Sequence, residues 1–289
     1  MVTIQNEILS VTINEKGAEL NNIYHKKYQL EYLWDADPAF WAKRSPVLFP
    51  VIGTLKNNTY FFEGKAYELG RHGFARERLF SVWEQTDESV SFSLVSDPDT
   101  LDKFPFKFQF IVKYSLRQNL LEVAYEVKNH SETNIYFSVG GHPAFKVPLI
   151  EGTDYEDYYL EFNSLENAGR WPISKDGLIE AEPLPMLNNT NRLFLTKSLF
   201  LKDALVFKDL LSSQVSLKSD RTLHGLNFDF TGFPYLGIWA APNANFVCIE
   251  PWCGIADSVD SDQQLTNKEG IVELRPEELF TRSWKVTFF

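Results

Sequence analysis

The side chains best suited to proton transfer are few, because the chain of 289 residues has only five histidines. His142 stands out, since it directly follows the glycines Gly140 and Gly141. The preceding run 134–139 alternates in side-chain character, which places His142 on the smaller and more polar face of an extended chain. Two glycines leave room there for a ligand or another backbone. A histidine in that place could exchange a proton near neutral pH, and a turn histidine with a satisfied hydrogen bond is the alternative.

A second candidate, Glu250, ends an apolar run that begins at Phe246. By alternation, Phe246, Cys248 and Glu250 share one face. A carboxyl group at the end of such a strand loses water, which raises its pKa from ~4.3 and makes it a useful base near neutrality. Trp252 follows and could stack on the face of a sugar. The alternative is a glutamate at a strand end that pairs with an arginine.

Two further segments carry polar groups that could bind a ligand. The stretch 70–78 is basic within an acidic chain and contains His72 and Arg76. This stretch could bind the hydroxyl groups of a ligand, or a phosphate through the fork of a guanidinium group. The alternative is a charged turn in contact with solvent, and this alternative fits Arg78 better. Asp203 opens the apolar run 201–207, where it could accept hydrogen bonds from ligand hydroxyls or simply cap a turn.

The elements that must position these side chains are short β-like runs separated by turn signals. Such pairs of runs are 59–62 with 66–69, 82–85 with 90–95, and 106–116 with 120–127. Regular spacing of this kind is typical of a sandwich or barrel. Helical periodicity is never sustained over three turns. The best helical candidate is 37–41, where Asp37 could cap a helix with Pro38 at its first position.

One stretch, 230–249, contains no charged residue and could be mistaken for a membrane-spanning helix. It contains two prolines and two asparagines, whereas a spanning helix is a mainly apolar run. We expect two buried strands around a turn instead. The chain shows no linker and no repeat, and its least strand-like part, 148–185, is interpreted as a long excursion from one sheet. We therefore predict an all-β protein, a single antiparallel β-sandwich domain covering residues 1–289.

Composition restricts the partners. The net charge is −11 and the pI about 5.0, which argues against nucleic acid and anionic membranes as partners. Aromatic residues reach 15%, which suits sheet packing and ring stacking against a ligand. The two cysteines, Cys248 and Cys253, cannot form a disulfide framework or a structural zinc site. The first seven residues lack the features of a secretory signal, so we expect a cytoplasmic protein.

Taken together, the motifs occur in a recognisable order. The sequence resembles the aldose 1-epimerase (galactose mutarotase-like) family, in its LacX-type branch. The resemblance covers nearly the whole chain and rests on six segments in order: Gly17-Ala18-Glu19-Leu20, residues 44–53, His72-Gly73-Phe74-Ala75-Arg76, Gly141-His142-Pro143-Ala144-Phe145, Asp203-Ala204-Leu205-Val206-Phe207 and Glu250-Pro251-Trp252.

The resemblance implies a large β-sandwich with a sugar site on a concave face. It implies an isomerase that exchanges the α and β anomers of an aldose or sugar phosphate through the open-chain form, with no metal and no other cofactor. His142 would be the acid at the ring oxygen and Glu250 the base at the C1 hydroxyl. His72 would bind the ring region and Asp203 would hold hydroxyl groups, with Arg44 as a further contact.

Some features depart from the better-known galactose mutarotases. The better-known galactose mutarotases carry an Asn-Arg pair early in the chain, whereas in this sequence Arg44 is followed by Ser45-Pro46. The segment around Arg76 also resembles the branch that acts on hexose 6-phosphates, so Arg71 or Arg76 could meet a phosphate. Two other functions stay open: a carbohydrate-binding or sensing protein without turnover, and a glycoside hydrolase with paired carboxylates. The oligomeric state and the identity of the sugar are not determined by the sequence.

Overall fold

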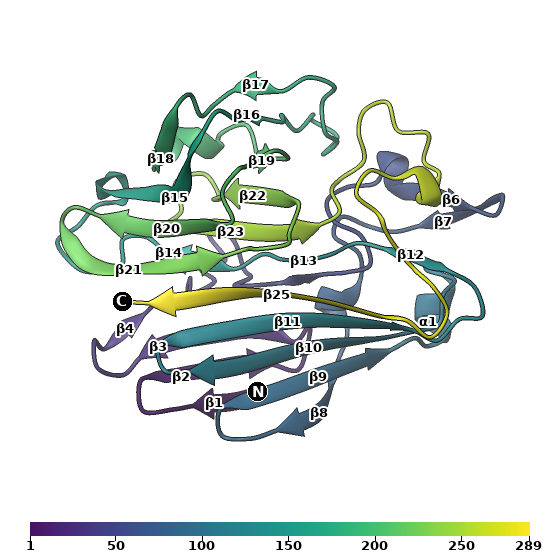
Figure 1. Cartoon of the computed structure of the whole chain (residues 1–289), viewed down its shortest axis with the longest axis horizontal. Helices are drawn as coiled ribbons and strands as arrows, with labels where there is room; N and C mark the ends of the chain where they lie inside the picture. The colour runs from purple at the N-terminus through teal and green to yellow at the C-terminus, as the bar shows by residue number, and fades with distance from the viewer.

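Strands joined by short turns make up most of the protein, as the recurring apolar runs predict (Figure 1). The computed structural model describes residues 1–289. All ladders between the named strands are antiparallel, which confirms the all-β prediction. The only α-helix is α1 (Pro98–Leu101). Five single 3-10 turns complete the regular structure: Lys56–Asn58, Ala75–Glu77, Tyr155–Asp157, Lys197–Phe200 and Leu265–Asn267.

A nine-stranded sheet runs through the whole molecule, from β8 at the bottom of Figure 1 to β18 near the top. Its order is β18 (Thr190–Phe194), β15 (Tyr158–Glu166), β20 (Gln214–Ser219), β21 (Thr222–Asp229), β25 (Leu279–Phe288), β11 (Leu120–Asn129), β10 (Phe108–Arg117), β9 (Ser89–Val95) and β8 (Ser81–Gln85).

A smaller sheet carries parts of four of the six segments on which the resemblance rests: 44–53, 141–145, 203–207 and 250–252. Its order is β19 (Leu205–Phe207), β22 (Tyr235–Trp239), β23 (Phe246–Cys253), β13 (Val139–Gly141) and β5 (Val47–Leu48), and β14 (Ala144–Lys146) also pairs with β23. A four-stranded sheet is formed by β1 (Val2–Gln5), β2 (Leu9–Asn14), β3 (Glu19–His25) and β4 (Leu30–Glu31). Three further pairs are β6 (Thr59–Phe62) with β7 (Lys65–Glu68), β12 (Ile135–Phe137) with β24 (Val272–Leu274), and β16 (Gly169–Arg170) with β17 (Leu184–Pro185).

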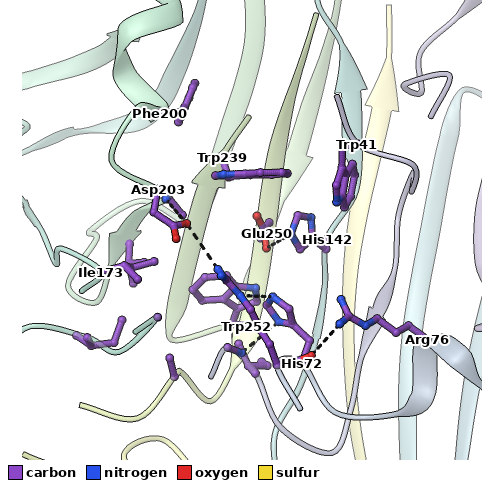
Figure 2. A pocket seen from close by; sticks show the side chains of 18 of the residues that line it. Trp41, His72, Arg76, His142, Ile173, Phe200, Asp203, Trp239, Glu250 and Trp252 are labelled. Carbon is purple, nitrogen blue, oxygen red and sulfur yellow. Dashed lines mark hydrogen bonds and ion pairs between the residues drawn. The ribbon is translucent and has the colours of Figure 1, made fainter. Parts of the chain in front are cut away.

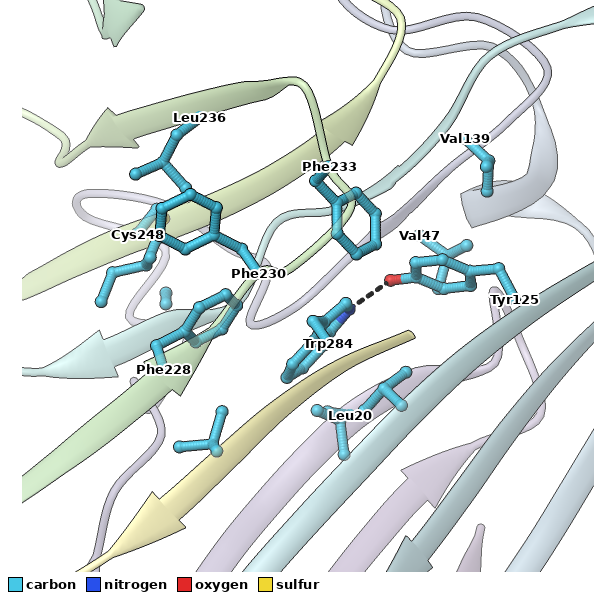
Figure 3. Packing of buried hydrophobic residues seen from close by; sticks show 14 of the residues in the cluster. Leu20, Val47, Tyr125, Val139, Phe228, Phe230, Phe233, Leu236, Cys248 and Trp284 are labelled. Atoms are coloured by element: carbon cyan, nitrogen blue, oxygen red, sulfur yellow. Dashed lines mark hydrogen bonds between the residues drawn. The ribbon is translucent and has the colours of Figure 1, made fainter. Parts of the chain in front are cut away.

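The smaller sheet packs directly on the large one, as Figure 3 shows for the residues between them. There Trp284 of β25 donates its indole N–H to the hydroxyl group of Tyr125 in β11, over 2.9 Å. Gly141 of β13 lies so close above them that a Cβ atom there would be 2.7 Å from that hydroxyl group. The same apolar core includes residues from Ile4 to Phe288. The glycine before His142 thus lets the two sheets approach.

Several predicted hairpins are present. The pairs β6–β7, β8–β9 and β10–β11 form at the expected positions. The uncharged stretch 230–249 contains β22 and leads into β23, and the two strands pair around a turn as predicted. None of the helices is both long enough and apolar enough to cross a membrane.

Two local predictions were wrong. The segment 37–41 is a single turn, in which the carbonyl of Asp37 accepts from the N–H groups of Phe40 and Trp41, and no helix follows. The region 148–185 contains β15, a nine-residue strand inside the large sheet. Its alternating buried residues were obscured by the acidic and proline-rich turns around it, and only the part after residue 168 is an excursion with the short pair β16–β17.

Candidate active site

The register of β23 brings His142 and Glu250 together. Gly140 in β13 pairs with Trp252, and Ala144 in β14 pairs with Cys248. Counting two residues inward from either pair places His142 opposite Glu250, although the ladder is interrupted there. Facing side chains of an antiparallel pair have Cβ atoms only ~4.5–5.5 Å apart. A contact between the two groups therefore follows from the strand pairing.

The two side chains meet in a buried position. His142 Nε2 lies 3.3 Å from Glu250 Oε2, and the side chains are 10% and 2% exposed (Figure 2). Burial raises the pKa of Glu250 well above its usual value and lowers the pKa of His142 to about 3. Burial therefore favours the uncharged form of both groups, a protonated carboxyl group and a neutral imidazole. A histidine that exchanges its proton near neutral pH, as the sequence suggests, would need an ordinary pKa.

Aromatic rings fix the imidazole of His142. The indole of Trp41 stacks on it with ring centroids 4.9 Å apart at 27°, and Trp239 meets it edge-on at 5.6 Å and 83°. The sequence analysis selected neither tryptophan. Trp41 lies in the turn that was interpreted as a helix, and Trp239 ends β22. Only the folded structure shows that both tryptophans contact His142.

Trp252 spans the floor of the same region. A Cβ atom on Gly237 would lie 2.5 Å from its indole ring, and one on Gly140 would lie 2.8 Å from it. The absence of side chains at these neighbouring positions makes space for the ring. Trp252 is 5% exposed and its indole nitrogen has no hydrogen-bond partner.

His72 reaches the pair from another loop. Its ring centroid lies 5.7 Å from that of His142, in an edge-on arrangement. Its backbone has a φ of +67° and is held by Gly53, whose N–H donates to Nδ1 of His72 over 3.1 Å. Burial lowers the pKa of His72 well below its usual value, and the neighbouring His142 adds to this effect.

Charged groups surround the opening. Arg71 Nη2 lies 3.6 Å from Asp203 Oδ1, which also accepts from the N–H of Ala204 over 2.8 Å. Arg76 donates to the carbonyl of Arg71 over 2.9 Å, while its buried Nε has no partner. Arg71 and Asp203 thus form an ion pair at the cavity, and Arg76 adds a second guanidinium group to its lining.

These residues enclose one cavity of about 450 Å³, which lies within the ~300–1,000 Å³ range of small-molecule sites. Six of the seven predicted site residues line it: His72, Arg76, His142, Asp203, Glu250 and Trp252. Eleven of the twenty lining residues are hydrophobic. Buried polar atoms without a hydrogen-bond partner are rare in proteins, yet four of the nine in this chain belong to lining residues, namely Arg76, His142, Glu250 and Trp252. These four unpartnered atoms could form hydrogen bonds with a polar ligand in the cavity.

Arg44 is the exception, and its prediction as a sugar contact must be corrected. It does not line the cavity. Its guanidinium group donates to the backbone carbonyls of Asn21 and Asp35, and its backbone N–H donates to Glu19. Those partners lie far away in sequence, so the motif that contains Arg44 gave no sign of them. Arg44 lies in the loop before β5, and its hydrogen bonds connect this loop to β3 of the N-terminal sheet and to Asp35.

Comparison with known proteins finds a matching family and similar sequences. The sequence model of the family described as aldose 1-epimerase matches residues 1–269. The chromosomal and plasmid forms of protein LacX from Lactococcus lactis subsp. lactis are each 34% identical to the chain over 295 residues, covering 99% of this chain and 98% of theirs.

Solved structures give the same result. A galactose mutarotase related enzyme from Lactobacillus acidophilus superposes with a TM-score of 0.95 at 38% identity, covering 100% of this chain and 97% of the other. A galactose mutarotase-like protein from Lactobacillus casei ATCC 334 gives a TM-score of 0.94 at 31% identity, with 100% of both chains covered.

Proposed function

The chain belongs to the aldose 1-epimerase family, and from this premise we propose that it interconverts the α and β anomers of an aldose or sugar phosphate. The observation that carries this proposal is the buried contact of 3.3 Å between His142 and Glu250 inside an aromatic-lined cavity. An acid and a base side by side suit a hemiacetal, because its ring oxygen and its hydroxyl group are attached to the same carbon.

In the proposed reaction the two groups act as a unit that holds one proton. When the sugar binds, the proton moves from the carboxyl group of Glu250 to Nε2 of His142. An imidazolium and a carboxylate then face the hemiacetal. His142 donates its proton to the ring oxygen as the bond from C1 to that oxygen breaks. Glu250 accepts the proton of the C1 hydroxyl, and an aldehyde forms. The pair again holds one proton, and rotation about C1–C2 followed by the reverse steps gives the other anomer.

The remaining cavity residues suit a sugar. Trp252 and Trp239 offer apolar ring surface to the C–H groups of a pyranose, while His72 and Asp203 offer a donor and an acceptor to its hydroxyl groups. Arg76 has an unpaired buried Nε that can donate to a hydroxyl or a phosphate oxygen. We propose the cytoplasm as the location, where thiols such as those of the two free cysteines stay reduced.

Anomer exchange followed by NMR tests this function. The protein should accelerate equilibration of at least one pure anomer in a panel of aldoses and aldose phosphates. The substitutions Glu250→Gln and His142→Asn should each lower the rate ~10²–10⁴-fold, the usual contribution of a proton-transfer group, while circular dichroism stays unchanged. The exposed residues Glu68 and His130 provide matched controls, since Glu68→Gln and His130→Asn should keep full activity.

Two outcomes would contradict the proposal. Rates no faster than buffer across the whole panel would exclude an anomerase acting on these sugars. Tight binding of a sugar without any acceleration would identify a carbohydrate-binding protein that keeps the family's pocket.

A further inference from the structure

A buried thiol lies next to the proton-transfer pair. Cys248 precedes Glu250 by two residues in β23, so both side chains leave the strand on the same face. Cys248 also pairs with Ala144, two residues after His142. As a result, a nitrogen of His142, the sulfur of Cys248 and a carboxylate oxygen of Glu250 all lie within 4.8 Å of one another, and all three residues are buried. The sugar reaction described above makes no use of this sulfur.

We propose that His142, Cys248 and Glu250 form a binding site for a thiophilic divalent cation, with Zn²⁺ as the reference ion, and that its occupation blocks the reaction. One imidazole nitrogen, one thiolate and one carboxylate are a ligand set suited to zinc, and its binding would release the thiol proton of Cys248 and the carboxyl proton of Glu250 to solvent. Three protein ligands would leave the fourth position of a tetrahedral ion open toward the cavity.

The distances come close to those of such a site. Bonds of ~2.3 Å to sulfur and ~2.0–2.2 Å to nitrogen or oxygen bring tetrahedral ligand atoms to roughly 3.5 Å from one another. His142 Nε2 and Glu250 Oε2 are already 3.3 Å apart. Because the ligand atoms all lie within 4.8 Å of one another, the thiol of Cys248 would need to approach by at most about 1.3 Å, which small side-chain rotations can supply.

The pair also has free coordinating capacity. Glu250 Oε2 has no hydrogen-bond partner, and neither has Nδ1 of His142. Buried polar atoms without partners are costly, and a cation would satisfy Oε2 of Glu250. The stacked ring of Trp41 holds the imidazole of His142 in place, so little order has to be created on binding. Both His142 and Glu250 line the cavity, which gives an ion access from solvent.

Binding of the ion and catalysis should exclude each other. A cation on His142 and Glu250 takes the lone pairs that the proposed proton transfers need, and it displaces the shared proton. The open fourth position also lies where the hemiacetal would sit. The blocking effect rests on the proposed function, whereas binding of the ion does not.

Binding is tested directly on the metal-free protein. Titration with Co²⁺ should give a thiolate-to-metal charge-transfer band that saturates at one ion per chain, and Zn²⁺ should abolish it by displacement. Cys253 lies on the same strand and is buried, but it is outside the cluster. The substitution Cys253→Ala should therefore keep the band, while Cys248→Ala should lose it.

Zinc affinity gives the quantitative test. Loss of a ligand should weaken Zn²⁺ binding of Cys248→Ala by at least the ~10–100-fold that loss of an outer-shell partner costs. Should Cys248→Ala fail to fold, Cys248→Val, which keeps an apolar side chain of similar size, gives the same comparison. Absence of Co²⁺ and Zn²⁺ binding to the wild-type protein, or equal affinity in the Cys248 and Cys253 variants, would overturn the proposed site.

Anomer exchange measured with added Zn²⁺ completes the experiment. Zinc should inhibit the wild-type protein and Cys253→Ala, and Cys248→Ala should resist it by the same factor by which its zinc affinity falls. Binding without inhibition of an active wild-type protein would refute the blocking role. A protein that binds Zn²⁺ through Cys248 but never accelerates anomer exchange would keep the metal site and remove the proposed function.

Discussion

The backbone N–H of Gly53 donates a hydrogen bond of 3.1 Å to Nδ1 of His72, and the N–H of His72 returns one of 2.9 Å to the carbonyl of Gly53. A neutral imidazole that accepts at Nδ1 carries its proton at Nε2. Burial keeps the pKa of His72 low, so the ring stays neutral. The contact at Nδ1 is shorter than the 3.4 Å from Nε of Arg71 to Nε2 of His72, so Nε2 could donate to a ligand oxygen only if the ligand replaces Arg71 there.

The substitution His72→Asn should weaken sugar binding more than it slows the chemistry. The amide oxygen can still accept from Gly53, but nothing replaces the N–H at the position of Nε2. A neutral hydrogen bond is worth ~0.5–1.5 kcal/mol, so KM should rise roughly 2- to 10-fold. Steady-state anomer exchange followed by NMR separates KM from kcat. A fall in kcat as large as that of Glu250→Gln would instead assign His72 to proton transfer.

The pH dependence of kcat/KM should reflect the shared proton of His142 and Glu250. The pair holds one proton from about pH 3, the pKa of His142, up to the raised pKa of Glu250. Below this window it holds two protons and lacks a base; above it, the pair lacks an acid. We therefore expect kcat/KM, corrected for the buffer rate, to show no fall as the pH drops through 4.5, the usual pKa of a glutamate, to about 4.

An unperturbed glutamate base would behave differently. With an ordinary pKa of 4.5, Glu250 would become protonated below that value, and kcat/KM would fall tenfold for each further pH unit. Such a fall beginning near pH 4.5 would contradict the shared-proton assignment. The same measurement on His130→Asn checks that no exposed histidine shapes the profile.

The two residues of the proposed proton-transfer pair could be selected from the sequence because their signals are local. Alternation along 246–250 places Glu250 on a defined face, and the same rule applied to 134–142 places His142. The structure adds the register that puts these two positions opposite each other. Strand existence was predictable for the same reason, since each hairpin has its turn residues between two apolar runs.

What the sequence could not give depends on contacts between distant segments. Trp41 reaches His142 from a turn about one hundred positions earlier in the chain, and no period or motif connects the two. The arginine of the motif at 44–53 was misassigned because its partners are backbone carbonyls, which any sequence can supply. The strand at 158–166 was missed because its composition was averaged with that of its acidic neighbours.

The substitution Gly237→Ala should damage the site by displacing Trp252. The added Cβ atom would lie 2.5 Å from the indole ring, closer than atoms can approach, and the backbone near Gly140 blocks movement on the other side. The ring must then shift into the cavity. Because a misplacement of 1 Å can cost ~10²-fold, kcat/KM should fall roughly 10- to 100-fold, as measured by anomer exchange.

The substitution Gly70→Ala is the matched control. A Cβ atom on Gly70 would have no neighbour within 4 Å, so this variant should keep its kcat/KM. Equal kcat/KM values for Gly237→Ala and the wild-type protein would show that the position of Trp252 does not matter to the reaction.

The substitution Glu250→Gln should stabilise the protein increasingly as the pH rises. Below pH 4.5 the carboxyl group is protonated in both the unfolded and the folded chain. Above that value the unfolded chain ionises, but the buried group keeps its proton, because burial raises its pKa. The unfolded state then binds fewer protons than the folded state, so the free energy of unfolding falls by ~1.36 kcal/mol per pH unit until the raised pKa is reached. The glutamine of the variant does not ionise, so the variant does not lose free energy of unfolding in this way.

The difference in unfolding free energy between Glu250→Gln and the wild-type protein should therefore grow from about pH 4.5 upward and then level off, as urea denaturation at a series of pH values would measure. The titration of His142 acts on both proteins alike and cancels to a first approximation. A constant offset from the different hydrogen bonding of the amide does not affect the slope. The exposed variant Glu68→Gln should show no such trend. A difference independent of pH would mean that Glu250 is ionised in the folded protein, which would contradict the assignment of the proton to its carboxyl group.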